Sequence, residues 1–253
     1  MNKFGIIIAL ALVIGLIVSG CAGNSEPEPE PEPEPMPING IFAAIPWQER
    51  ELLDYVMYDY SGNETGAIAM TLARELDDSY VLKQVFIFQQ QVYTLLTITK
   101  VRADNLKPVN GMITLGNISP APLIKYSYGD GVLNIASTDT ENNLTNRTID
   151  LPEDAYDDNE LFFMLRALPF KVGYTASFTN IIVASGAKYP VTVTVVGEEE
   201  LQSPAGAFNT YKVELDMAEV KQYLWYAQKK PHFLIKLDDG ESIILLSEIA
   251  EEL

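Results

Sequence analysis

The property that most restricts the fold is a two-residue alternation of apolar and polar side chains, which returns along most of the chain. In residues 191–195 three valines alternate with two threonines, and in residues 211–217 apolar side chains alternate with lysine, glutamate and aspartate. Such alternation is typical of half-buried strands, because successive side chains of a strand point to opposite faces. Turn-forming clusters such as Ser61-Gly62-Asn63 and Gly129-Asp130-Gly131 separate the runs. The pattern predicts a mainly β fold, an antiparallel curved sheet of roughly nine to eleven strands that forms an open or half barrel with one or two short helices.

One segment departs from this alternation and predicts a short helix. Asp157, Asp158 and Glu160 precede an apolar stripe at helical spacing that ends at Pro169. We expect the acidic residues to cap the helix and its apolar face to cover one side of the sheet. The same acidic run could offer oxygen ligands to Ca²⁺, but it lacks the spacing of an EF-hand, so no metal site is predicted. Residues 217–221 fit a second helical piece and a continued strand equally well.

Composition excludes several classes of function. The 253 residues contain one cysteine and one histidine, so no disulfide can form within the chain and a transition-metal centre is not expected. The formal net charge of −18 argues against nucleic-acid binding and against a domain that lies flat on anionic lipid. No cofactor is predicted.

The first 20 residues have the layout of a lipoprotein signal peptide. Lys3 precedes an apolar run that closes with Val18-Ser19-Gly20, directly before Cys21. This ending resembles the lipobox of prokaryotic lipoproteins, in which the cysteine sulfur receives a diacylglyceryl-type lipid and the chain is cut just before it. The resemblance implies that Cys21 anchors the mature protein to the cell membrane, on its outer face or in the periplasm. An uncleaved membrane-spanning helix and a plain secreted product are the alternatives, and all three place the rest of the chain outside the membrane.

A spacer follows the cysteine. Its Glu-Pro repeats, from Glu26 to Pro35, favour a stiff polyproline II chain. The chain thus divides into a signal peptide (1–20), the lipidated cysteine with its spacer (21–37) and a single β-rich extracytoplasmic domain (38–253).

From Leu165 onward a series of short motifs follows in a recognisable order. The motifs are Leu165-Arg166-Ala167-Leu168-Pro169-Phe170, Val172-Gly173, Val195-Val196-Gly197-Glu198-Glu199, Pro204-Ala205-Gly206-Ala207-Phe208 and Tyr223-Leu224-Trp225-Tyr226. This series resembles an uncharacterised family of prokaryotic envelope β-proteins, catalogued as a domain of unknown function, whose members look broadly like the curved half-barrels of the lipoprotein carriers LolA and LolB. The resemblance implies a fold and an envelope location, but no chemistry, because the family carries no agreed activity.

The sequence shows no recognisable catalytic motif. It has no Gly-x-Ser-x-Gly elbow and no phosphate-binding glycine loop. The one histidine, His232, is predicted to be an exposed or edge residue of a strand. Acidic pairs such as Asp54 and Asp59 are too common in this chain for their spacing to indicate a hydrolase. We therefore predict that the protein is not an enzyme, with a carboxylate-dependent hydrolase as the least favoured alternative.

We predict a membrane-tethered lipoprotein whose β domain binds an apolar ligand, a lipid or a segment of an envelope protein. The alternative is a purely structural or interaction module of the cell envelope. The predicted ligand contacts are aromatic and methionine side chains of the sheet, namely Tyr58, Met70, Phe86 and Trp225. Four Asn-x-Ser/Thr sequons, expected in turns or loops, are candidate glycosylation sites: Asn63, Asn117, Asn143 and Asn146.

Overall fold

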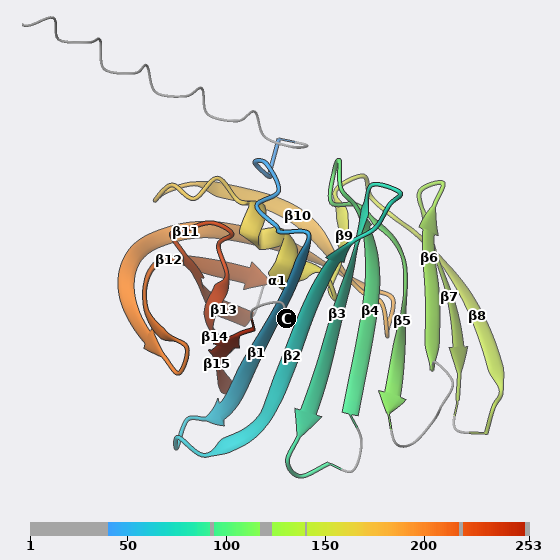
Figure 1. Ribbon diagram of the computed structural model, residues 1–253. Helices are drawn as coiled ribbons and strands as arrows, with labels where there is room; N and C mark the ends of the chain where they lie inside the picture. Colours follow the sequence, from blue (N-terminus) through green and yellow to red (C-terminus); the bar gives the residue numbers. More distant parts are fainter. Residues whose placement is uncertain (1–39, 92–93, 117–122, 140, 218–219, 251–253) are drawn as a thin grey trace, which may run out of the picture. The chain divides into compact units, whose positions relative to one another are not determined.

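A sheet of fifteen strands is the main element of the described part of the chain (Figure 1). The computed structural model describes residues 40–91, 94–116, 123–139, 141–217 and 220–250, all of which belong to one compact unit, Pro35–Leu253. The predicted signal peptide, Cys21 and the spacer lie outside the described residues, so these three assignments stay predictions.

The first eight strands are, in chain order, β1 (Arg50–Asp59), β2 (Glu64–Arg74), β3 (Ser79–Phe88), β4 (Thr94–Arg102), β5 (Pro108–Gly116), β6 (Ile124–Gly129), β7 (Val132–Thr138) and β8 (Leu144–Asp150). A short strand and a short helical segment come next: β9 (Ala155–Asp157), α1 (Leu161–Met164) and the 3₁₀ helix η1 (Leu165–Ala167). The remaining strands are β10 (Thr175–Ile182), β11 (Ala187–Ser203), β12 (Gly206–Met217), β13 (Val220–Ala227), β14 (Leu234–Asp238) and β15 (Ser242–Ile249).

The order of strands in the sheet largely follows the order in the chain. It runs β8-β7-β6-β5-β4-β3-β2-β1-β15-β14-β13-β12-β11-β10-β9, so the first strand pairs with the last in the middle, and β8 and β9 are the two terminal strands. The pairs are antiparallel except β9–β10, which is parallel. Hairpins therefore build both halves of the sheet, and the pair β1–β15 joins them.

The predicted count of nine to eleven strands is wrong, because several strands do not show the alternation on which that count depends. Five of the six described side chains of β8 before Asp150 are exposed, whereas all three side chains of β9 are buried. A strand whose side chains are nearly all exposed or all buried gives no period of two. The mainly β, antiparallel character is confirmed, as is the prediction that the sheet stays open.

The sheet curls so that its two halves face each other, and apolar side chains fill the space between them. The segment α1–η1 lies in this space (Figure 1) and buries Leu161, Phe163 and Met164. Trp47, from the segment before β1, packs edge-on against Phe163 at a ring-centroid distance of 6.4 Å, and its Nε1 donates to the Phe163 carbonyl oxygen. The inner face, where the sequence suggested an apolar ligand, is thus packed with the protein's own side chains.

A second, smaller cluster holds the far ends of the sheet together. Tyr126, Leu133 and Ile135 of β6 and β7 pack with Ile181 of β10 and with Val183. The sheet therefore rolls far enough to bring strands from both halves into contact.

The predicted helix is present but shorter than expected, and the acidic residues do not cap it. Glu160 is the residue before α1 and its side chain makes no cap hydrogen bond, while Asp157 is the last residue of β9. Met217 is the last residue of β12, and Val220 and Lys221 belong to β13, so the described residues of 217–221 lie in strands, as the strand alternative predicts. Among the described residues, no helix has the length and apolar character needed to cross a bilayer.

Candidate interaction face on the outside of the sheet

The outer face of β1 to β6 carries a continuous group of apolar side chains and two lysines. Side chains on this face fall into rows, because directly paired residues of neighbouring strands point to the same face. The rows are Val56, Ala67 and Ile87; Ala69, Val85 and Leu96; and Leu52, Thr71, Lys83, Ile98, Met112 and Lys125. We call these residues the outer patch.

None of the residues in the outer patch is buried. Ile87 is 48% exposed and Leu52 is 39% exposed, and the other apolar members are half-buried by their neighbours on the sheet. Isolated exposed apolar residues are ordinary, but a contiguous group on one face is typical of a surface that contacts another molecule.

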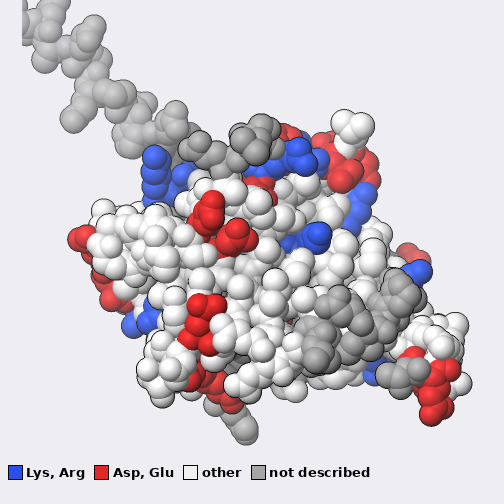
Figure 2. Space-filling view, turned by 60° about the horizontal axis from the view of Figure 1, so that its bottom comes forward, with Lys and Arg blue, Asp and Glu red and all other residues white. Residues whose placement is uncertain are grey.

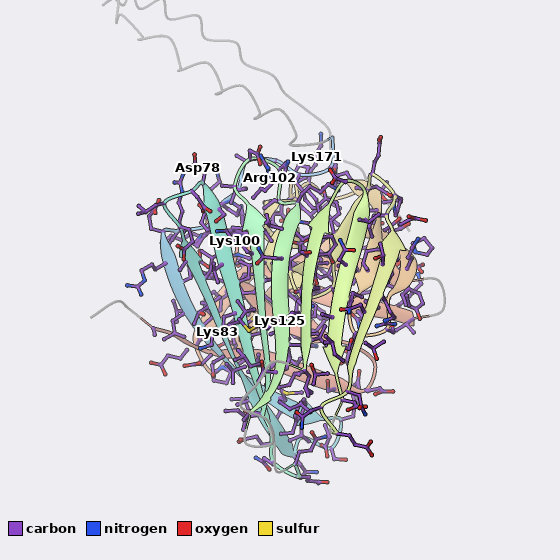
Figure 3. The ribbon with its side chains drawn as sticks, turned by 90° about the vertical axis from the view of Figure 1, so that its right-hand side faces the viewer. Asp78, Lys83, Lys100, Arg102, Lys125 and Lys171 are labelled. Carbon is purple, nitrogen blue, oxygen red and sulfur yellow. The ribbon has the colours of Figure 1, made fainter. Side chains whose placement is uncertain are left out.

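The two lysines of the outer patch are exposed and form no ion pair with any residue that the structure describes. By contrast, the Nζ of Lys100, closer to one end of β4, lies 2.6 Å from a carboxylate oxygen of Asp77. Figure 3 shows Lys83 and Lys125 near the middle of the sheet, and Lys100, Arg102 and Asp78 nearer its end. The ammonium groups of these two lysines are therefore available on this face, which also carries the acidic Asp54 of β1, paired with Ala69.

The outer face of the other half of the sheet is different, because paired charges cover its aromatic side chains. The ring of Trp225 is only 4% exposed, and the ammonium groups of Lys212 and Lys236 lie 4.9 and 4.3 Å from its centroid. Its indole N–H donates to Glu199. Lys221 adds a further ion pair nearby, 2.6 Å from Glu214. Charged side chains therefore cover the aromatic side chains of this half, although Val196 of β11 and Val220 of β13 are 41% and 48% exposed.

Charged residues are unevenly spread on the surface that Figure 2 displays. Acidic side chains gather there in small groups, separated by broad uncharged areas. On this face the net negative charge of the chain does not form a continuous coat, so locally positive or neutral surfaces are compatible with the acidic composition.

The four predicted ligand contacts do not come together. Met70 and Phe86 face the inner side of the sheet, where Met70 is 3% exposed and Phe86 packs against the core. Tyr58 is paired with Ile243 on the opposite, outer side of β1, and Trp225 lies beneath its lysines in the other half. They form no common pocket, and their role as ligand contacts stays an untested prediction.

The sequons lie in different settings. Asn63 and Asn143 are exposed residues of turns, each hydrogen-bonded to an aspartate four residues earlier. Asn146 is exposed but lies in β8, so it is not the loop residue that was expected. Asn117 lies outside the described residues.

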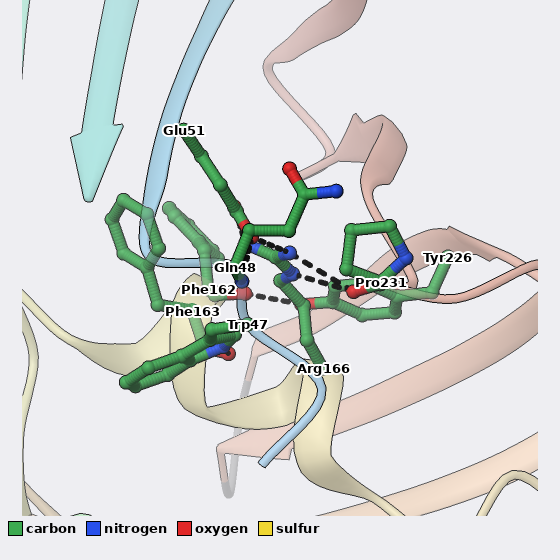
Figure 4. A network of polar contacts seen from close by, with 8 residues as sticks. All are labelled: Trp47, Gln48, Glu51, Phe162, Phe163, Arg166, Tyr226 and Pro231. Atoms are coloured by element: carbon green, nitrogen blue, oxygen red, sulfur yellow. Dashed lines mark hydrogen bonds and ion pairs between the residues drawn. The ribbon is translucent and has the colours of Figure 1, made fainter. Parts of the chain in front are cut away.

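Inside the sheet, a fully satisfied ion pair links α1–η1 to both halves (Figure 4). The guanidinium of Arg166 donates to both carboxylate oxygens of Glu51 at 2.6 and 2.9 Å, and the two side chains are 2% and 1% exposed. Its Nε and Nη2 also donate to the carbonyl oxygen of Pro231, at 3.1 and 2.9 Å. Tyr226 donates to the carbonyl of Phe162 beside this pair. This network fixes the helical segment and offers no open site.

A second group of charged side chains lies before α1 and is far less balanced. Asp157 and Glu160 are fully buried, and Asn159 donates from Nδ2 to Asp157 at 2.8 Å and to Asp158 at 3.1 Å. Burial raises the pKa of Asp157 and Glu160, and burial together with the charge of Asp157 raises the pKa of Asp158 to about 8. We call Asp157, Asp158 and Glu160 the acidic cluster.

One cation, Lys107, interacts with the acidic cluster, and burial lowers its pKa. Its Nζ donates to the carbonyl oxygens of Glu153 and Ala155 at 2.7 and 2.9 Å. One ammonium cannot neutralise three buried carboxylates, so part of the cluster is protonated near neutral pH.

The acidic cluster resembles a catalytic site only in its raised pKa values. Two of its carboxyls are fully buried, and the described residues contain no group of histidine, cysteine, aspartate or glutamate side chains arranged to hold a metal ion. The sequence indicated the acidic run itself, but not its burial, which depends on Gln84 of β3 and on Tyr126 and Tyr128 of β6.

The other candidate catalytic residues, His232 and Asp59, contact backbone groups of nearby turns and strands and not a second catalytic side chain. His232 does not lie in a strand as predicted but in the turn before β14, where its Nδ1 lies 2.8 Å from the carbonyl oxygen of Ala227 and burial lowers its pKa. Asp59 accepts hydrogen bonds from the backbone of Ser61 and Asn63, so it shapes the β1–β2 turn rather than pairing with Asp54.

A family model described as "Protein of unknown function (DUF3108)" matches residues 54–246. This match confirms the predicted relation to a domain of unknown function, whereas the likeness to LolA and LolB stays a prediction. No curated protein matches the chain.

Two solved structures are similar at low identity. One, from Bacteroides fragilis and described as an exported protein with a YmcC-like fold, is 13% identical with a TM-score of 0.36, over 83% of this chain and 100% of that one. The other, from Parabacteroides distasonis and described as a lipoprotein, is 12% identical with a TM-score of 0.32, over 83% of this chain and 99% of that one. At these TM-scores neither likeness adds to the argument.

Proposed function

The chain belongs to the family of proteins of unknown function DUF3108, and from this premise we propose that it is a membrane-tethered, non-enzymatic lipoprotein outside the cytoplasm. We further propose that its β domain docks a partner protein on the outer patch. The tether rests on the lipobox-like sequence before Cys21.

The observation that carries this proposal is the difference between the two outer faces of the sheet. The outer patch leaves Ile87, Leu52 and the ammonium groups of Lys83 and Lys125 accessible, whereas ion pairs cover Trp225 on the other half. A partner with an apolar centre and acidic residues around it would bury the apolar rows and pair with the lysines.

The packed inner face argues against a ligand carried between the halves of the sheet. Trp47, Phe163 and Met164 occupy the space that a lipid would need, and each is less than a tenth exposed. The buried position of the acidic cluster likewise argues against a carboxylate hydrolase, since a substrate has no route to Asp157 or Glu160.

Site-specific photo-cross-linking tests the docking face. A photoreactive amino acid at Ile87 is compared with one at Val220 in β13, because both positions are 48% exposed but lie on opposite halves of the sheet. We expect a protein adduct of defined mass from position 87 and none from position 220, and we expect Lys83→Glu with Lys125→Glu to abolish it. Equal labelling at both positions, or an adduct with lipid alone, contradicts docking of a protein.

The tether is tested separately. Cys21→Ser should leave an unprocessed precursor that no longer incorporates labelled palmitate, as measured by metabolic labelling and mass spectrometry of the N-terminus. Normal processing and membrane retention of this variant contradict lipid anchoring at Cys21.

A further inference from the structure

The two terminal strands of the sheet are protected to very different degrees. At one end, β9 is buried, and Lys107 donates to the carbonyl oxygens of Glu153 and Ala155 beside it. At the other end, β8 pairs with β7 alone among the described strands, and all its side chains except Ile149 are exposed. Terminal strands are usually protected by proline, bulges, charges or a covering element, because their free backbone groups pair readily with another chain.

β8 has no proline, no bulge and no free cation, and its one acidic residue, Asp150, is its last. Its seven residues contain no proline, and its register with β7 runs from Leu144 to Asp150 without a bulge. Its one cation, Arg147, is used elsewhere, since its guanidinium donates to the carbonyl oxygens of Ser185 and Ala184 at 2.9 and 3.1 Å. Arg147 thus attaches β8 to the residues that follow β10. The backbone groups along the free edge of β8 are covered by no other described element.

A groove runs beside this edge on the outer face of β6 to β8. It has a volume of about 430 Å³, and Lys125, Asn134, Asn146 and Thr148 are among its lining residues. Paired residues place Ala136 between Lys125 and Asn146, and the small alanine side chain leaves room between these two longer ones. A strand added beside β8 would lie next to Asn146, with Ala136 one strand and Lys125 two strands further in. A long acidic side chain that crosses the groove above Ala136 would therefore approach the ammonium of Lys125, which pairs with no described residue.

We propose that β8 is a docking edge at which an extended segment of a partner protein adds as a further strand, with an acidic side chain in the groove. Backbone hydrogen bonds to β8 supply the affinity, and Lys125 selects the acidic residue. The proposal goes beyond the docking on the outer patch, with which the edge shares only Lys125.

A second copy of this chain fits the edge less well. Antiparallel pairing of two β8 strands centred on Arg147 would place the two Arg147 side chains directly opposite each other, and like charges in this position are destabilising. The segment is therefore expected to come from a different protein.

The test uses the full-length chain and a phage-displayed library of random dodecapeptides as the probe. Binding peptides are synthesised, and their affinities for the wild type are compared with those for Thr145→Pro and Asn146→Pro. Adjacent residues of a strand direct their N–H groups to opposite sides, so one proline removes an outward donor and the other removes a donor to β7. Circular dichroism identifies the variant that keeps its fold.

We expect the folded proline variant to lose peptide binding, and the selected peptides to share an acidic residue. Lys125→Glu should weaken binding by about tenfold or more, whereas Lys229→Glu, an exposed lysine in the turn before β14, should leave it unchanged. Peptides that bind both proline variants as tightly as the wild type, an absence of binders, or a dimer of the wild type that the proline variants dissociate would each overturn the proposal. Charge reversal at Lys83 should affect binding at the outer patch and not peptide binding at β8. This variant therefore distinguishes a wrong proposal for the outer patch from a wrong proposal for the β8 edge.

Discussion

Two buried groups of charges lie at opposite ends of the same short helical segment, and they are balanced in opposite ways. After α1, the single cation Arg166 meets the single anion Glu51 through two hydrogen bonds and gives its remaining donors to Pro231. Before α1, Asp157, Asp158 and Glu160 share one cation, Lys107.

The comparison shows two ways of burying charge in one core. In a matched, bidentate pair the two opposite charges and their hydrogen bonds compensate for the hydration that each partner loses on burial. An excess of carboxyls instead takes up protons, because burial disfavours the charged form. The second arrangement makes the stability of the domain depend on pH.

Of the changes considered, replacement of Arg166 should lower the free energy of unfolding most. Arg166→Met leaves the Glu51 carboxylate buried without a partner, which typically costs roughly 3–5 kcal/mol of the free energy of unfolding. Urea denaturation followed by circular dichroism measures this loss. The double variant Arg166→Met with Glu51→Met should recover a substantial part of it, and a single variant that loses less than about 1 kcal/mol would show that the pair is not buried in solution.

Neutralising Asp158 of the acidic cluster should change how the free energy of unfolding depends on pH. Because the pKa of Asp158 is raised to about 8 in the folded state, the folded chain binds more protons than the unfolded chain between about pH 4 and pH 8. Stability is therefore highest at the acidic end of this range and is lost as the pH rises, by at most ~1.4 kcal/mol per pH unit for one carboxyl. Asp158→Asn keeps an acceptor for the Val183 N–H and should flatten this dependence.

Between pH 5 and pH 8 the lowered pKa of His232 acts in the opposite direction, because the unfolded chain then binds more protons at this side chain. The difference between the wild type and Asp158→Asn isolates the contribution of Asp158, since His232 is present in both. Surface carboxyls with a lowered pKa, such as Asp77 and Glu214, stay ionised throughout that range and lose their partners only in more acidic solution. If Asp158→Asn has the same slope of stability against pH as the wild type between pH 5 and pH 8, Asp158 is not protonated in the folded state.

Replacing Lys107 should have an intermediate effect. Lys107→Met removes two hydrogen bonds to the carbonyl oxygens of Glu153 and Ala155, and it removes the ammonium 3.8 Å from the ring centroid of Tyr156. We expect a loss of about 1–3 kcal/mol and a steeper fall in stability with rising pH, since the carboxyls lose their cation. Lys229→Met, at an exposed lysine, is the matched control; an equal loss in both variants would contradict a specific role for Lys107.

The smallest effect is expected at Gln84. Its Nε2 donates to the carbonyl oxygen of Asn159 at 2.6 Å, but its Oε1 has no partner among the described residues. Gln84→Leu removes one hydrogen bond and one unsatisfied acceptor together, so the free energy of unfolding should change by less than about 1 kcal/mol. A loss several times larger, measured by urea denaturation, would indicate that Oε1 is hydrogen-bonded in solution.

The parts of the fold that depend on local pattern could be predicted from the sequence. The hairpin of β6 and β7 follows from two alternating runs around Gly129-Asp130-Gly131, and the helical segment follows from its apolar spacing before Pro169. Strands without alternation, such as β8, could not be recognised in this way.

The candidate site could not be predicted, because it depends on contacts between distant residues. Arg166 stands out in the sequence as a charged residue between apolar ones, but its partner Glu51 lies 115 residues away, so the sequence does not indicate their ion pair. The outer patch combines exposed and half-buried residues from six strands, and only their register shows that Ile98, Met112 and Lys125 lie in one row. The acidic run was noticed, whereas its burial beneath Tyr126 and Tyr128 follows from the curl of the sheet.

The pairing of β1 with β15 has a consequence for how the molecule is made. The central ladder joins Leu53 to Ile249, so a growing polypeptide cannot complete the middle of its sheet until synthesis has reached its last hairpin. Loss of that hairpin, for instance through a premature stop codon, would remove strands from the centre of the sheet and not from its edge. The two halves would then remain as separate sets of hairpins with no backbone pairing between them.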